Sequence, residues 1–197
     1  PSGGAGNLVT ASFSLGNTSS VSAITYAVDI SVTAVNDAPT AANVLFSTNA
    51  SNVTEDDTNP SGVAVSTLFP SSVFSDSTDN KSSTNGSTAN TLQGIFITKD
   101  NSASTEGDWE FRAGSSGAFT KISTLTTMSA TAPLYLAAAS ELRFVPAEDY
   151  NGDVGQLDAY VVDNSDSSIL PSGGAGNLVT ASFSLGNTSS VSAITYS

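Results

Sequence analysis

The chain contains one segment twice, and this repeat limits its architecture more than any other feature. Residues 1–26 recur without a change as residues 171–196, at a spacing of 170 residues. A repeat at this spacing corresponds to whole domains in series, because solenoid repeats are only about 20–50 residues long. We therefore expect slightly more than one period of a tandem array. Identical domains in a row form spacers, stalks or multivalent surfaces more often than enzymes.

The apolar residues predict an all-β domain. They occur in short runs, none of which is long enough to span a membrane. The clearest strand pattern is residues 26–35, where Val28, Ile30 and Val32 alternate with polar side chains. Further strands are expected at 8–15, 21–25, 42–47, 63–69, 92–99, 108–113, 118–123, 133–137, 141–145, 156–162, 178–185 and 191–195. Many short strands with turns between them are typical of a β-sandwich.

Alternation within these strands predicts the core. A Gly/Ser turn at 114–117 predicts a hairpin between its flanking strands. Residues 134–140 are the only segment that could form a helical turn as an alternative to the strand at 133–137. The residues expected on the inner face of the sandwich are Trp109, Phe111, Phe119, Leu142, Phe144, Tyr160 and Val162.

Composition excludes several kinds of function. The chain has no cysteine and no histidine, which excludes zinc sites built from them, catalysis by them, and disulfide bonds. The net charge of −13 repels nucleic acid and anionic membranes but attracts cations, although acidity also serves solubility alone. Pairs of Asp and Glu are the groups used in glycoside hydrolysis. Since the unit is repeated and shows no aromatic-lined cleft, we expect no enzymatic activity.

A domain boundary is expected where the strand pattern of residues 26–35 ends. The sequence there is Asn36-Asp37-Ala38-Pro39-Thr40. Proline lacks a backbone donor and biases the preceding residue towards an extended conformation, so this segment is typical of a link between domains.

Four segments, in this order, give the chain a family resemblance. They are residues 30–39 (I-x-V-T-A-V-N-D-A-P), 74–76 (F-S-D), 108–111 (D-W-E-F) and 142–152 (L-R-F-V-P followed by D-Y-N-G). Together they resemble the cadherin-like and Ig-like tandem repeats of giant bacterial surface adhesins, including the RTX type. The resemblance covers about residues 23–197.

This resemblance implies an Ig/cadherin-like β-sandwich that stacks head to tail with neighbouring copies. Residues 1–37 would be the C-terminal strands of the preceding repeat, and residues 38–197 one repeat without its last strand. The missing strand corresponds to residues 27–37, which a neighbouring copy would supply by covalent continuity or by strand exchange. The implied role is that of a structural extender repeat, one that adds length to an extracellular or cell-surface protein. It implies no membrane insertion in this segment and leaves the adhesion target open.

The alternative is a binding module in which each repeat recognises carbohydrate or a partner surface. Trp109 together with Tyr135, Tyr150 and Tyr160 would be the candidate sugar-binding face. At strand spacing, aromatic residues more often belong to a core.

The acidic residues gather in turns, where the resemblance implies calcium. Calcium takes six to eight oxygen ligands from carboxylates, amides and backbone carbonyls. The candidate ligands are Asn36, Asp37, Glu55, Asp56, Asp76, Asp79, Asp149, Asp153, Asp163 and Asp166. The alternative for each is a solvated turn held by its own hydrogen bonds. The spacing of Asp149, Asn151 and Asp153 does not continue as an EF-hand loop, because Val154 and Tyr160 stand where Gly and Glu are needed.

Overall fold

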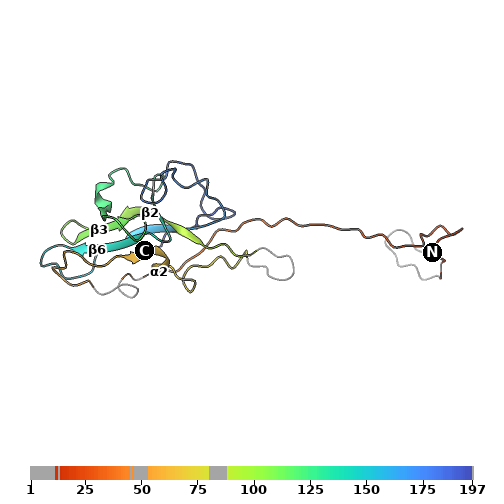
Figure 1. The fold of residues 1–197 in the computed structure, drawn as a ribbon, viewed down its shortest axis with the longest axis horizontal. Coiled ribbons are helices and arrows are strands. Elements are labelled where there is room, and N and C mark those ends of the chain that lie inside the picture. Colours follow the sequence, from red (N-terminus) through yellow and green to blue (C-terminus); the bar gives the residue numbers. More distant parts are fainter. Residues whose placement is uncertain (1–11, 13, 45, 47–52, 80–87, 197) are drawn as a thin grey trace. The chain divides into compact units, whose positions relative to one another are not determined.

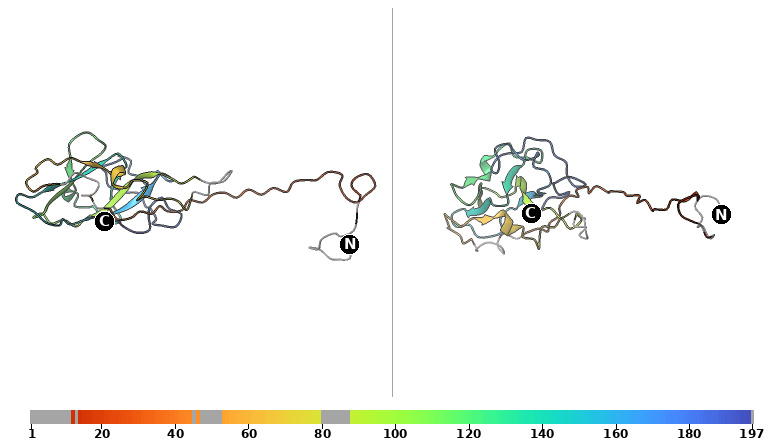
Figure 2. Two further views of the ribbon diagram at one scale, coloured as in Figure 1. Left: turned by 90° about the horizontal axis from the view of Figure 1, so that it is seen from below. Right: turned by 45° about the vertical axis from the view of Figure 1, so that its right-hand side comes forward.

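The computed structural model describes residues 12, 14–44, 46, 53–79 and 88–196, in two units divided between Thr33 and Ala34. Among the described residues, every strand belongs to the second unit. Figures 1 and 2 show this unit from three sides.

Two antiparallel sheets make up the second unit. The first sheet has the order β1 (Val63–Ala64), β6 (Glu141–Pro146), β3 (Gly107–Arg112), β4 (Thr120–Lys121). The second has the order β5 (Leu134–Ala137), β2 (Leu92–Asp100), β7 (Leu157–Asp163). The only helical pieces described with full bounds are α2 (Val65–Leu68) and the 3₁₀ turn η1 (Ile122–Thr124). The chain is therefore mostly β-sheet, as predicted, and the two sheets are arranged as in a sandwich.

The main core lies between the two sheets. Register pairs Trp109 with Phe144 and Phe111 with Leu142 across β3 and β6, and all four side chains are buried, as predicted. The Trp109 ring packs edge-on against Phe144 and Phe46, with ring centroids 5.3 and 5.1 Å apart. The facing sheet contributes Ile95, Ile97, Leu134, Leu136, Ala159 and Val161.

A second apolar cluster covers the opposite face of the β5-β2-β7 sheet. It contains Phe96, Tyr135, Val162, Ile169, Val179 and Val191. The prediction that Tyr160 and Val162 lie in the main core is wrong, because Ala159 and Val161 point there instead. Since both faces of this sheet are covered, β7 carries apolar residues on both faces, and alternation alone does not identify the inner one.

Phe119 also differs from its predicted place in the core. It is half-buried, and its ring lies under the guanidinium groups of Arg143 and Arg112, 4.0 and 4.6 Å from the ring centroid. These two arginines form ion pairs with Glu110 and Glu141. Phe119 therefore belongs to a charged outer surface of the first sheet.

The two copies of the repeated segment form the same local turn. Gly16 and Gly186 both have positive φ (71° and 65°), and the asparagine after each is positive as well (46° and 51°). The amide of Gly16 donates to the Val21 carbonyl at 2.8 Å, and the amide of Gly186 donates to the Val191 carbonyl at 2.9 Å. The turn is thus specified by the segment itself.

The environments of the two copies differ. In the second copy, Val191 and Tyr196 make isolated antiparallel bridges to β7 and both are buried. In the first copy, Val21 is exposed, and Tyr26 is 74% exposed against 4% for Tyr196. The side chains of the repeated segment are therefore buried only in the copy that pairs with the edge of a sheet.

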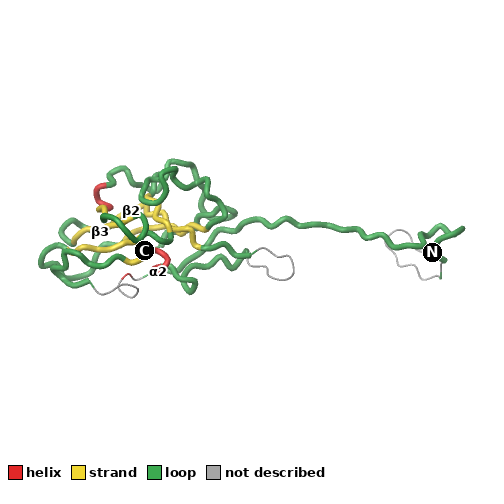
Figure 3. The backbone as a smooth tube through the Cα atoms, viewed as in Figure 1, coloured by secondary structure: helices red, strands yellow, loops and turns green. Residues whose placement is uncertain are grey.

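The strand predicted at residues 26–35 is not formed. Residues 25–39 contain neither helix nor strand, and Val28, Ile30 and Val32 are 98%, 90% and 89% exposed. Figure 3 draws this segment as a loop. A lone extended segment has no partner for its backbone groups, so a strand pattern without a neighbouring edge does not become a strand.

Several shorter predictions also differ from the structure. Residues 134–137 form strand β5, which confirms the strand predicted at 133–137, so the helical turn considered for 134–140 is wrong. Of the strands predicted in the two repeat copies, 21–25 is not formed, and 178–185 and 191–195 contain only isolated bridges. Residues 63–69 begin as β1 but continue as α2, and residues 42–44 form no strand. The predicted strand at 8–15 lies mostly outside the described residues.

Candidate metal centre

Six polar residues gather at one end of the sandwich, and we call them the junction cluster: Asn36, Asp37, Asp76, Asp79, Asn90 and Asp163. Three loops and one strand end bring them together. Asn36 and Asp37 lie just before Pro39, the two aspartates follow Phe74, and Asn90 precedes β2. Asp163 ends β7 and is paired with Leu92 of β2.

Hydrogen bonds hold the loops of the junction cluster together. The Asp37 amide donates to both carboxylate oxygens of Asp79 at 3.1 Å. The Asn90 amide donates to Asp76 Oδ2 at 2.6 Å, and its side-chain nitrogen donates to Asn36 Oδ1 at 2.8 Å. Asp79 and Asp76 are thus drawn together even though they carry like charges.

Two carboxylate oxygens in the cluster are buried without a hydrogen-bond partner. Asp163 is 0% exposed and its Oδ2 has none, while its Oδ1 accepts from the Ser165 amide at 2.8 Å. Asp76 is 5% exposed and its Oδ1 has none. Buried polar atoms nearly always have partners, so these two oxygens are the atoms of the cluster at which a proton, a water molecule or a cation would be bound.

Electrostatics in the cluster agree with this conclusion. Burial raises the pKa of Asp163 above its ordinary value, the charges of Asp76 and Asp79 raise it further, and hydrogen bonds from Ser165 oppose the rise. Burial likewise raises the pKa of Asp76, with the charges of Asp79 and Asp37 adding to it against hydrogen bonds from Asn90. Ionising these carboxylates is therefore less favourable than ionising a solvated aspartate.

The donor chemistry of the cluster fits calcium. It offers carboxylate and amide oxygens, which are the ligands of a hard cation. Among the described residues, no three acidic side chains are already spaced as a closed metal-binding set. The two buried carboxylate oxygens without partners are the feature of the cluster that bears on a cation.

A second group of predicted ligands lies where two loops meet. Its residues have no buried carboxylate oxygen without a hydrogen-bond partner. The Asp149 amide donates to Asp56 Oδ1 at 3.0 Å, and the side-chain nitrogen of Asn151 donates to Glu55 Oε2 at 3.1 Å. All four residues are exposed, and Asp56 and Asp149 have positive φ (65° and 60°). These hydrogen bonds join two solvated turns. Each residue therefore matches the alternative to a calcium ligand, which is a turn held by its own hydrogen bonds.

Two predicted ligands lie outside both groups of contacts. Asp166 is exposed in a turn in which its Oδ1 accepts from the Ser168 amide at 2.8 Å, and hydrogen bonds from Ser168 lower its pKa. Asp153 is exposed as well, and its backbone carbonyl accepts from the Tyr150 hydroxyl. Asp163 and Asp166, which are neighbours in sequence, thus have opposite environments, one buried and one solvated.

Sequence reasoning missed Asn90 and the contact that Asn36 makes with the second repeat copy. The Asn36 side-chain nitrogen donates to the Ser189 carbonyl at 3.1 Å, and the Ala38 amide donates to the Asn187 carbonyl at 2.7 Å. The available signal was position, because Asn90 stands two residues before β2, whose first residue, Leu92, pairs with Asp163 at the end of β7.

The candidate sugar-binding aromatics do not share an exposed face. Trp109 is buried and its Nε1 donates to the Gly155 carbonyl at 2.9 Å, and Tyr135 is buried in the second apolar cluster. Their rings are therefore part of the packing.

Comparison with known protein families, with characterised proteins and with solved structures gave no match. No helix among the described residues is both long enough and apolar enough to cross a membrane.

Proposed function

We propose that the chain is a structural extender repeat of a bacterial cell-surface adhesin or extracellular filament. In this role, Ig/cadherin-like sandwiches stack head to tail, and calcium at the junction cluster stiffens each junction. The resemblance of four sequence segments to adhesin repeats supports the class of protein, and the two-sheet fold agrees with it.

One observation carries the proposal: the repeated segment is itself part of the sandwich. The second copy bridges the edge of β7 through Val191 and Tyr196, and the segment that follows the first copy contacts the second copy's turn through Asn36. This placement supports a fold that repeats with the period of the sequence. Repetition then adds complete sandwiches along a line, which is what an extender requires.

Calcium would act on the junction cluster by supplying the missing positive charge. Asp37, Asp76, Asp79 and Asp163 would hold it, with amide oxygen from Asn36 or Asn90. These residues come from the link before Pro39, the loop after Phe74 and the end of β7. A cation held by all three fixes the link against the sandwich, so the junction loses freedom.

Thermal melting in calcium and in chelator tests the proposal. Calcium at one hundred times its Kd adds about 2.7 kcal/mol of stability. For a chain of this size, that raises Tm by about 5–10 °C. Asp76→Asn should remove most of this increase in Tm, because it removes the negative charge of a carboxylate whose Oδ1 has no hydrogen-bond partner. Asp166→Asn is the matched control and should keep it, since Asp166 is solvated. Equal Tm values in calcium and chelator for the unaltered chain would refute the calcium role.

A further inference from the structure

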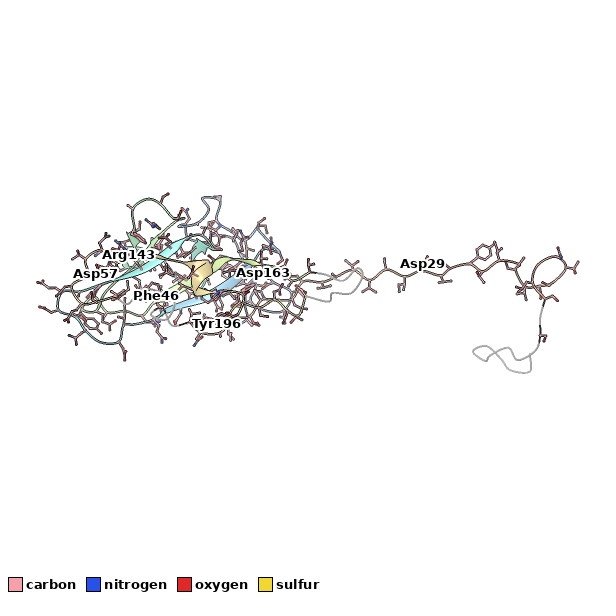
Figure 4. All side chains as sticks on the ribbon, turned by 60° about the horizontal axis from the view of Figure 1, so that its bottom comes forward. Asp29, Phe46, Asp57, Arg143, Asp163 and Tyr196 are labelled. Carbon is pink, nitrogen blue, oxygen red and sulfur yellow. The ribbon has the colours of Figure 1, made fainter. Side chains whose placement is uncertain are left out.

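An apolar pocket of about 630 Å³ lies between the two sheets, at the edge of the sandwich. Among the residues that line it are Val44, Phe46, Trp109, Leu157, Ala159 and Tyr196. Figure 4 labels Phe46 and Tyr196. Protein interiors are close-packed, and voids much larger than a water molecule are few. This pocket is open at the edge of the apolar core and has room for further apolar side chains.

The strand that would fill the pocket is already begun by the second repeat copy. Ala159 of β7 and Tyr196 exchange two backbone hydrogen bonds, of 2.9 and 2.6 Å, in an antiparallel bridge. In an antiparallel ladder, the next such pair lies two residues further along each strand. On β7 this position is Leu157, and among the described residues none pairs with it on that edge.

The repeat identifies the sequence that continues this ladder. Tyr26 is the counterpart of Tyr196, and the residues after it are Ala27-Val28-Asp29-Ile30-Ser31-Val32. If Tyr26 is placed where Tyr196 lies, Val28 falls opposite Leu157. Tyr196 packs into the main core, and side chains two residues apart share a face. Val28, Ile30 and Val32 would therefore point into the pocket.

We propose that this pocket binds residues 27–33 of a second copy of the chain as an added antiparallel strand beside β7. The inference deepens the proposed function and rests on it, because it names the contact by which copies join head to tail. Val28, Ile30 and Val32 are nearly fully exposed, so the donor segment is available. Asp29, which Figure 4 labels, alternates with these residues and would lie on the opposite face of the added strand, in water.

A chain cannot place its own segment in this register. Asn36 contacts the Ser189 carbonyl, and the neighbouring Ser190 carbonyl accepts from the Asp163 amide, so Asn36 lies at the Asp163 end of β7. In the register above, Val32 lies beyond the opposite end of β7, about 33 Å along the strand direction from Asp163. The four residues from Val32 to Asn36 reach at most about 14 Å. Residues 27–33 can therefore enter the pocket in this register only from another copy of the chain.

The contact joins different surfaces of the two copies. It is heterologous, so a joined pair keeps one unused pocket, on the copy that donates, and one unused donor segment, on the copy that accepts. Such a contact does not close by itself, so the expected product is an open chain of molecules. The donor's Tyr26 and the residues before it remain outside, because the acceptor already carries its own second copy in that place.

The test compares the full chain with two exposed-site variants by sedimentation velocity over a concentration series. Ile30→Asp places a charge on the face that enters the pocket, and Ser31→Asp places the same charge on the outer face. Both residues are exposed, so neither change threatens folding. The unaltered chain and Ser31→Asp should associate, and Ile30→Asp should stay monomeric. A synthetic peptide of residues 27–37 should bind to the Ile30→Asp chain and change the emission of Trp109, the only tryptophan.

Three results would overturn the inference in different ways. If the unaltered chain stays monomeric at every concentration, copies do not join through this contact. If all three chains associate alike, head-to-tail stacking stands but uses another surface, so only the pocket assignment falls. If the peptide does not bind to the Ile30→Asp chain, residues 27–33 are not the occupant.

Discussion

Phe144→Ala should destabilise the chain by about 3–5 kcal/mol, which is the usual cost of removing a buried phenylalanine. Phe144 is buried on β6, pairs directly with Trp109 of β3, and packs against its ring at a centroid distance of 5.3 Å. The edge-on aromatic pair accounts for about 0.5–1.5 kcal/mol of this. The rest comes from lost burial and from the cavity left between the sheets.

Phe119→Ala is the matched control. Phe119 is half-buried beneath two guanidinium groups and outside the main core. Its loss should cost about 1–2 kcal/mol, since each exposed cation–π contact contributes about 0.5–1 kcal/mol. Urea unfolding followed by Trp109 fluorescence measures both, and an unchanged m-value shows that only stability has changed. A cost below about 1 kcal/mol for Phe144→Ala, or a larger cost for Phe119→Ala, would refute the assignment of the core.

Two further predictions concern the junction cluster and the repeated turn. The raised pKa of Asp163 gives stability that is complete below its ordinary pKa of 3.8 and is lost as the pH rises through the raised value. In chelator, raising the pH from about 3 to about 7 should therefore lower the stability of the unaltered chain relative to that of Asp163→Asn. Urea unfolding of both chains at the two pH values measures this. A difference between their urea midpoints that is the same at both pH values would contradict the prediction. Gly186→Ala should cost about 1–3 kcal/mol, because φ is +65° and the new Cβ would lie 2.8 Å from Ala193 Cβ. Gly16→Ala makes the same change in the same sequence outside the sandwich unit, and calorimetry should show its main transition unchanged.

Local signals in the sequence were enough to predict the class of fold and most of its strands. The segments at 92–99, 108–113, 141–145 and 156–162 correspond closely to β2, β3, β6 and β7. Each of these strands has a neighbour within the sandwich, so the local preference and the tertiary contacts agree.

The failures occur where structure depends on a partner distant in sequence. Residues 26–35 carry the clearest strand pattern but have no neighbouring edge to pair with. The two repeat copies show the same rule, because the Gly/Asn turn forms in both, whereas Tyr196 is buried and Tyr26 is exposed. A turn is specified by its own residues, and a strand needs a second one.

The candidate site was predictable in part. Sequence reasoning selected Asp37, Asp76, Asp79 and Asp163, which the fold brings together. It also selected Glu55, Asp56 and Asp149, which are exposed in turns, although the family resemblance favoured only Asn36, Asp37 and Asp163 over this alternative. Acidic residues in turns look alike in sequence, and what separates them is burial, which depends on the packing of loops far apart in the chain.

Small-angle X-ray scattering on a chain lengthened by one further period of 170 residues tests the extender role most directly. The nine residues of β2 alone span about 30 Å, so each added sandwich should lengthen the particle by at least that amount. In calcium, we predict rod-like scattering with this increase in the longest dimension. In chelator, the same chain should scatter as sandwiches joined by flexible links. An unchanged longest dimension on adding the period, or identical scattering in calcium and chelator, would contradict a calcium-stiffened extender.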